Sequence, residues 1–150
     1  MKNETRIAVP LKDAPDFEVA DHDPDVRGWE VKDANGARIG EVDQLLVDTD
    51  ARKVRYLDVG VDSDLLETKE ERHILIPIGS ARLDRGEEHV RVDRLRAVDL
   101  AQLPEYRHEP LTHDYEIVLR QRFDPDYKAA KSRTGDFYAH EIYDSDRFYL

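Results

Sequence analysis

The fold is decided by the stretch between residues 26 and 104, which begins VRGWEVKDANGARIGEVDQLLVDTDARKVRYLDVGV (26–61) and ends LAQLP (100–104). Its clearest element lies at residues 57–61, where Leu57, Val59 and Val61 alternate with Asp58 and Gly60. Strict alternation of apolar and other residues predicts a β-strand with one buried face. We therefore expect the three apolar side chains to point into a core and Asp58 to point outward.

Two strands are predicted before this one. The first centres on Trp29 and Val31, and the second runs from about residue 37 to residue 47. Between them, Asn35-Gly36 supplies backbone positions that tolerate positive φ, which is typical of a tight hairpin turn. The apolar residues of the second strand do not keep a period of two, which indicates a bulge near Asp43.

Two further strands follow. One contains isoleucines at positions 74, 76 and 78, with Pro77 at its edge or end, and the other contains Val90 and Val92. Short strands at this spacing, without long helices between them, predict a mainly β fold, a small antiparallel β-barrel. Its expected core residues are Trp29, Leu57, Val59, Ile74, Ile76 and Val92.

The barrel is expected to have an appendage on each side. Residues 1–25 are polar and rich in proline, so we interpret them as an extended lead-in, in which Phe17 and Val19 reach the barrel. Residues 26–104 form the barrel domain. In residues 105–150, an amphipathic helix is predicted from about Thr112, its cap, to Phe123. An irregular, charged and aromatic tail then follows, ordered only against the barrel or another chain.

Composition excludes several classes of function. The 150 residues contain 23 Lys and Arg against 34 Asp and Glu, a formal net charge of −11. This balance argues against nucleic-acid binding, which needs a basic surface. The chain has no cysteine, and no apolar run approaches the roughly 18 residues of a membrane-spanning helix, so direct membrane insertion is not expected. The N-terminus lacks the apolar run of a signal peptide, and we expect a cytoplasmic protein.

Few residues in the sequence have the spacing of a catalytic or metal-binding motif. The six histidines form no ligand motif, so no metal site is expected, and no catalytic residues or cofactor motifs are identified. The acidic segment 21–25 resembles the start of a calcium loop, but Val26 and Lys32 stand where Gly and Glu are required. A small-molecule or cation-binding barrel that uses this segment is kept as an alternative function.

The aromatic residues after position 105 favour recognition of a protein partner or of a second copy. Rings placed among charges are typical of segments that dock through a few anchors, although the same rings could pack on their own barrel. We expect a homodimer, since closed two-fold dimers are the commonest oligomers. The expected partner or dimer contacts are Tyr115, Val118, Leu119, Phe137, Tyr138, Phe148 and Tyr149.

Five segments, taken in order, resemble one family. DPDVRGWEV (23–31), GEVDQLLVD (40–48), RYLDV (55–59), LIPI (75–78) and DLAQLP (99–104) are similar to the cytoplasmic domain of the photosynthetic reaction centre H subunit. Together they carry the signature of the PRC-barrel domain, which the ribosome maturation factor RimM shares. The resemblance covers residues 17–104.

The resemblance implies a binding scaffold. We therefore expect a non-catalytic interaction or assembly module with an unidentified protein partner. As an alternative, it implies a soluble relative of the H subunit in photosynthetic electron transfer and proton uptake. Asp48 and Asp58, together with Glu18, would then handle protons, although the chain lacks the membrane helix of that subunit.

Overall fold

The computed structural model describes residues 8–13, 24–48, 51–62, 71–93, 95–127 and 137–149. Its strands are β1 (Ala8–Pro10), β2 (Glu30–Lys32), β3 (Arg38–Asp48), β4 (Lys53–Val61), β5 (Arg72–Pro77), β6 (Ala81–Asp84) and β7 (His89–Val92). The helices are α2 (His113–Phe123) and α3 (Ser145–Phe148), with short 3₁₀ turns η1 (Leu11–Asp13), η2 (Ile78–Ser80), η3 (Ala97–Gln102) and η6 (Glu141–Tyr143).

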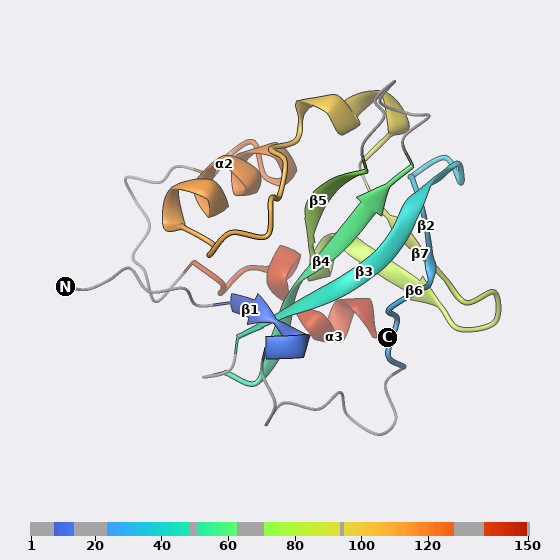
Figure 1. The fold of residues 1–150 in the computed structure, drawn as a ribbon, viewed down its shortest axis with the longest axis horizontal. Helices are drawn as coiled ribbons and strands as arrows, with labels where there is room; N and C mark the ends of the chain where they lie inside the picture. The colour runs from blue at the N-terminus through green and yellow to red at the C-terminus, as the bar shows by residue number, and fades with distance from the viewer. Residues whose placement is uncertain are drawn as a thin grey trace.

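The strands form one curled sheet in the order β5-β4-β3-β2-β7-β6, and β1 pairs with the end of β3. Figure 1 shows the long strands β3 and β4 crossing the middle of the molecule, with α2 to one side. The predicted mainly β, barrel-type fold is confirmed. One detail differs from the antiparallel prediction, because β2 and β7 pair in parallel. Strand β7 follows β6 in an antiparallel hairpin, and this second strand of the hairpin lies beside β2.

The predicted hairpin turn is present between β2 and β3. Gly36 has φ of 87°, and the Asp33 carboxylate accepts the backbone N–H groups of Asn35 (2.9 Å) and Ala37 (2.8 Å). Only Gly36 of the Asn35-Gly36 pair adopts the left-handed region. The predicted bulge is also confirmed, because the register of β3 against β4 shifts between Val42 and Gln44.

The predicted core is confirmed at five of its six positions. Leu57, Val59, Ile74, Ile76 and Val92 are buried together. Trp29 is only partly buried and packs against the edge of this core. The reason is local: β2 is short and buries only Val31, and Trp29 lies just before it, next to the left-handed Gly28.

Strand β4 is covered on both of its faces, and this corrects the prediction for Asp58. Tyr56, Asp58 and Gly60 are buried as fully as the apolar residues that alternate with them. Residues 104–112 and α2 supply the cover on this second face, where His108 contacts Asp58 and Glu116 contacts Tyr56. An alternating pattern therefore marks the apolar face of a strand without showing that the opposite face meets water.

Helix α2 begins where predicted, because the Thr112 side chain accepts the backbone N–H of Tyr115 (3.1 Å). Of the helix residues expected to make contacts, Leu119 is buried, Tyr115 is partly buried and Val118 is exposed. The helix buries Glu116, Leu119, Arg120 and Phe123, while Val118 is 45% exposed. Two of these four buried side chains are charged, so the hydrophobic pattern could not identify this face.

The C-terminal segment, residues 137–149, packs on its own barrel. Phe137, Tyr143 and Phe148 join the main core, and α3 contacts η2, β6 and β4. Gly79 makes this close packing possible, since a Cβ there would lie 1.9 Å from the Glu141 carbonyl oxygen. In the segment interpreted as a lead-in, Ala8–Pro10 forms β1, and Phe17 and Val19 lie outside the described residues.

Candidate functional site

A buried carboxylate between two imidazoles is the main polar feature of the barrel. Asp58, at 0% exposure, lies near the middle of β4. One of its oxygens is 2.7 Å from His73 Nδ1, and the other is 3.0 Å from His108 Nε2. The two imidazole rings meet edge to face, with their centroids 4.5 Å apart. His73 Nε2 in turn lies 2.9 Å from the carboxylate of Glu71.

Sheet register explains how His73 reaches Asp58. In the antiparallel pair of β4 and β5, Asp58 lies opposite Leu75. His73 lies two residues before Leu75, opposite Gly60. Residues in this diagonal relation project from the same face of a sheet. A prediction from the sequence that β4 pairs with β5 in this register would therefore have placed His73 beside Asp58. His108 could not be found in this way, because it comes from a loop that no local pattern connects to these strands.

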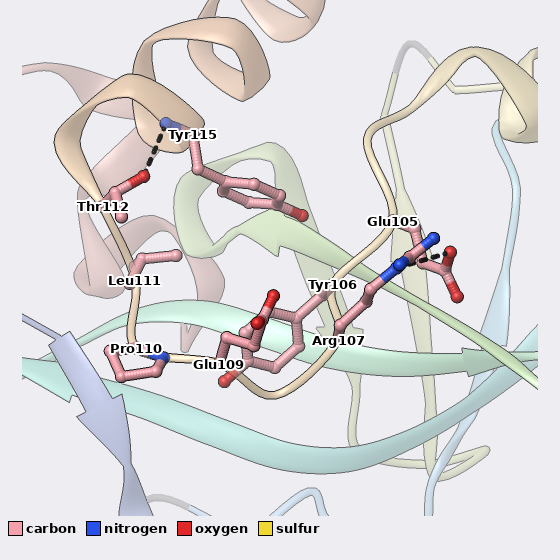
Figure 2. A pocket seen from close by; sticks show the side chains of 8 residues that line it. All are labelled: Glu105, Tyr106, Arg107, Glu109, Pro110, Leu111, Thr112 and Tyr115. Carbon is pink, nitrogen blue, oxygen red and sulfur yellow. Dashed lines mark hydrogen bonds and ion pairs between the residues drawn. The ribbon is translucent and has the colours of Figure 1, made fainter.

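The loop at residues 104–112 carries His108 and is fixed at several points. The backbone N–H of Tyr106 donates to the His73 carbonyl (2.8 Å), and the Tyr115 hydroxyl donates to the Pro104 carbonyl (2.9 Å). The Tyr106 ring packs against the His108 ring at 4.7 Å. Figure 2 shows this loop around a hollow of about 140 Å³, with Tyr106 and Tyr115 reaching toward it. The backbone of His108 is left-handed, with φ of 65°.

The pKa values of Asp58 and His73 are both shifted upward. Burial raises the pKa of Asp58, and the hydrogen bonds and charges of both histidines oppose that rise only in part. Burial lowers the pKa of His73, but the hydrogen bonds and charges of Asp58 and Glu71 outweigh it, so the net shift is upward. Both shifts have the same meaning, because each favours the protonated form of its group.

The same cluster could hold a metal ion. Asp43, Asp58, His73 and His108 each present one ligand atom, and these four atoms lie within 4.8 Å of one another. Asp43 is the bulge residue of β3, so the four come from β3, β4, β5 and the 104–112 loop. The sequence expectation of no metal site rested on spacing along the chain, and tertiary packing supplies the convergence that spacing lacks.

An acidic surface adjoins this cluster. Arg38 contacts three carboxylates: Asp62 at 2.9 Å, Glu30 at 3.0 Å and Glu41 at 3.2 Å. Together with Asp43 and Glu71, they make five carboxylates, which we call the acidic face. Four of the five, Glu41, Asp43, Asp62 and Glu71, line a hollow of about 180 Å³ with Arg38. Lys32 lies 3.7 Å from Glu30, so among the described residues of this face five carboxylates stand against two cations.

A second polar network is buried under α2. Glu116 accepts hydrogen bonds from the hydroxyls of Tyr56 (2.7 Å) and Tyr138, and the Tyr56 hydroxyl lies 3.2 Å from that of Tyr143. Burial raises the pKa of Glu116, and the two tyrosine hydrogen bonds oppose this shift. These contacts join α2, β4 and the C-terminal segment into one unit.

Of the three residues to which the resemblance gave a proton-handling role, Asp48 and Asp58 are described, and they have different partners. Asp48, at the end of β3, is 3.5 Å from the Arg55 guanidinium, and its carboxylate also accepts the backbone N–H of Ala51. Asp58 belongs to the histidine cluster described above. Glu18 lies outside the described residues, as does most of the acidic segment 21–25, of which Asp25 is paired with Arg27.

The predicted contact residues differ in exposure. Leu119, Phe137 and Phe148 are buried in their own chain, and Tyr115, Tyr138 and Tyr149 are partly buried against its core. Val118 is the one large hydrophobic side chain that the described part of the chain leaves exposed. The rings that suggested a docking surface therefore already have partners within the chain.

Two findings place these features in context. In the part of the chain that the structure describes, the helices are all too short or too polar to cross a bilayer. A sequence model described as the PRC-barrel domain matches residues 18–98, which is more than half of the chain. The match includes β2 to β7, and with them Asp43, Asp58 and His73, while His108 lies beyond its end.

Proposed function

The chain belongs to the PRC-barrel domain family, and from this premise we propose that it is a non-catalytic interaction module of the cytoplasm. Its docking surface is the acidic face, and its partner is a protein with a basic surface. The observation that carries the proposal is the convergence of three carboxylates on Arg38, with Asp43 and Glu71 beside them.

The charge of this face supports a partner of opposite sign. Five carboxylates against Arg38 and Lys32 leave a local negative charge, on a chain whose net charge is already −11. Clustered charge of one sign steers a complementary partner and raises its association rate. Recognition through apolar anchors has less support, because the C-terminal rings are engaged with the barrel.

A binding measurement with a cationic probe tests the proposal. The probe is a fluorescent decalysine peptide, and the variant is Glu30→Gln/Glu41→Gln/Asp62→Asn. The matched control, Glu87→Gln/Glu88→Gln/Asp126→Asn, removes three exposed carboxylates elsewhere on the surface. We expect the first variant to bind about tenfold more weakly, a loss of about 1.4 kcal/mol, and the control to bind within about twofold of the unmodified protein. Equal losses would mean that binding follows net charge alone, and the acidic face would be wrong as the docking surface.

Two other expectations stay predictions. The alternative of a soluble H-subunit relative with proton uptake relied on Asp48, Asp58 and Glu18; Asp48 pairs with Arg55 and Asp58 with two histidines, and Glu18 lies outside the described residues. The prediction of a homodimer rested on aromatic rings that were expected to be uncovered in the monomer. Light scattering at micromolar concentration tests this prediction by comparing the measured mass with the 17.4 kDa of one chain.

A further inference from the structure

We propose that Asp58, His73 and His108, with Asp43 as the fourth ligand, bind a borderline divalent cation of the Zn²⁺ class. The site shares Asp43 with the acidic face, but it requires no partner protein, and none of the residues changed in the docking variant (Glu30, Glu41 and Asp62) is one of its ligands, so the two proposals are tested separately. It rests on the distances, the outer contacts and the donor types of the cluster.

The distances are close to those of a four-coordinate site. Zinc bonds of about 2.0–2.2 Å to imidazole and carboxylate place tetrahedral ligand atoms roughly 3.4 Å apart. Asp58 Oδ1 lies 2.7 Å from His73 Nδ1 and Asp58 Oδ2 lies 3.0 Å from His108 Nε2, so each pair would spread by about half an ångström to reach this separation. With the Asp43 carboxylate included, all four ligand atoms lie within 4.8 Å of one another.

The outer contacts orient the histidines in the manner of metal sites. A metal-bound imidazole usually donates its second N–H to a carboxylate or carbonyl, which fixes the tautomer and makes the ligand more basic. His73 has this arrangement, since its Nε2 lies 2.9 Å from Glu71 while its Nδ1 faces Asp58. A carboxylate on the second ring nitrogen is the arrangement expected for a histidine that binds a metal.

The backbone holds the ligands on fixed elements. Asp58 and His73 lie on paired core strands, and the Tyr106 N–H bond to the His73 carbonyl ties the loop to β5. His108 has a left-handed backbone, which costs a non-glycine residue of the order of 1 kcal/mol and tends to occur at functional sites. The half-exposed ring of His108 and the exposed Asp43 leave an approach from solvent.

The donor set selects the class of ion. Two imidazole nitrogens and two carboxylate oxygens suit Zn²⁺, Co²⁺ or Ni²⁺, whereas Ca²⁺ and Mg²⁺ prefer oxygen ligands alone. The chain contains no cysteine, so soft ions that require thiolates are disfavoured. The neighbouring acidic face raises the local concentration of any cation.

Calorimetry with the tag-free full chain and ZnCl₂ tests the proposal. We expect one Zn²⁺ per chain with a dissociation constant in the micromolar range or below, and no displacement by millimolar Ca²⁺. His108→Gln should weaken binding at least tenfold, and it should fold, since its side chain lies on the surface of a loop. His113→Gln, which removes an exposed histidine from the start of α2, is the matched control and should bind like the unmodified protein.

A second measurement separates the site from nonspecific binding. Added Zn²⁺ should raise the melting temperature of the unmodified protein and of His113→Gln, but not that of His108→Gln. Bound Co²⁺ should give the intense visible absorption of a tetrahedral complex. Absence of a one-to-one heat signal, or equal weakening by the two histidine variants, would overturn the proposal and leave Asp58, His73 and His108 as a structural hydrogen-bond network.

Discussion

The packing of the C-terminal segment on the barrel can be tested at Gly79. This residue lies in η2, where the backbone of η6 passes directly over it. A Cβ at this position would be 1.9 Å from the Glu141 carbonyl oxygen and 2.7 Å from the Ile142 carbonyl carbon. Backbone atoms cannot rotate away as a side chain can, so Gly79→Ala must move the two segments apart by about 1.5 Å to restore ordinary contact.

The energetic cost follows from this displacement. Overpacking of this kind typically destabilises a protein by about 1–3 kcal/mol. If the segment detaches instead, Tyr143 and Phe148 lose their burial, and each such side chain contributes about 1.5–3 kcal/mol. We therefore expect Gly79→Ala to lower the free energy of unfolding by at least about 1 kcal/mol.

Urea unfolding followed by fluorescence of the single tryptophan, Trp29, measures this loss. Limited proteolysis should also cut the segment at residues 137–149 faster in the variant. Gly86→Ala is the control, because the nearest atom to its Cβ would be an Asp84 carboxylate oxygen at 3.5 Å. A Gly79→Ala protein within about 0.5 kcal/mol of the unmodified one, with unchanged proteolysis, would refute the close packing of η6 on η2.

Three further predictions concern the core, a buried acid and a helix cap. Ile76→Ala should lower the free energy of urea unfolding by about 2–5 kcal/mol, because its side chain is wholly buried; a loss under 0.5 kcal/mol would contradict the assignment of its face. The raised pKa of Glu116 stabilises the fold fully below its ordinary value of 4.5, and this contribution is lost as the pH rises through the folded-state pKa. Urea midpoints measured from pH 4 to 8 should therefore fall less in Glu116→Gln, and identical slopes would rule out this role. Thr112→Ala should lower the unfolding free energy by about 1 kcal/mol, with Thr112→Ser nearly neutral, since serine keeps the acceptor for the helix N–H; equal losses would exclude the cap.

Local features of this fold could be predicted from sequence because short-range physics determines them. The Gly36 turn, the bulge at Asp43 and the Thr112 cap each depend on residues within a few positions of one another. The strands in which Leu57 and Ile76 lie follow from alternation in the same way. The small barrel was predicted from the spacing of these short strands, and the family resemblance implies the same fold.

Other features depended on contacts that the sequence does not encode locally. The burial of Asp58 required a loop about fifty residues further along the chain, which brings His108 onto the outer face of β4. The buried face of α2 contains Glu116 and Arg120, because tyrosine hydroxyls and a backbone carbonyl satisfy these charges. Hydrophobic periodicity treats such residues as exposed, so it cannot identify the buried face of this helix.

Coverage of β4 on both faces links the fold to its polar sites. On one face Leu57 and Val59 complete an apolar core, and on the other Tyr56 and Asp58 lie beneath segments that come from beyond residue 103. Burial of a carboxylate without a partner is costly, so each covered acid must be matched by donors. Glu116 is matched by tyrosine hydroxyls, which cannot act as cation ligands without losing their own contacts. Asp58 is matched by two imidazoles, whose ring nitrogens are also common metal ligands. The same structural requirement therefore produces a closed network at Glu116 and a site open to ligands at Asp58.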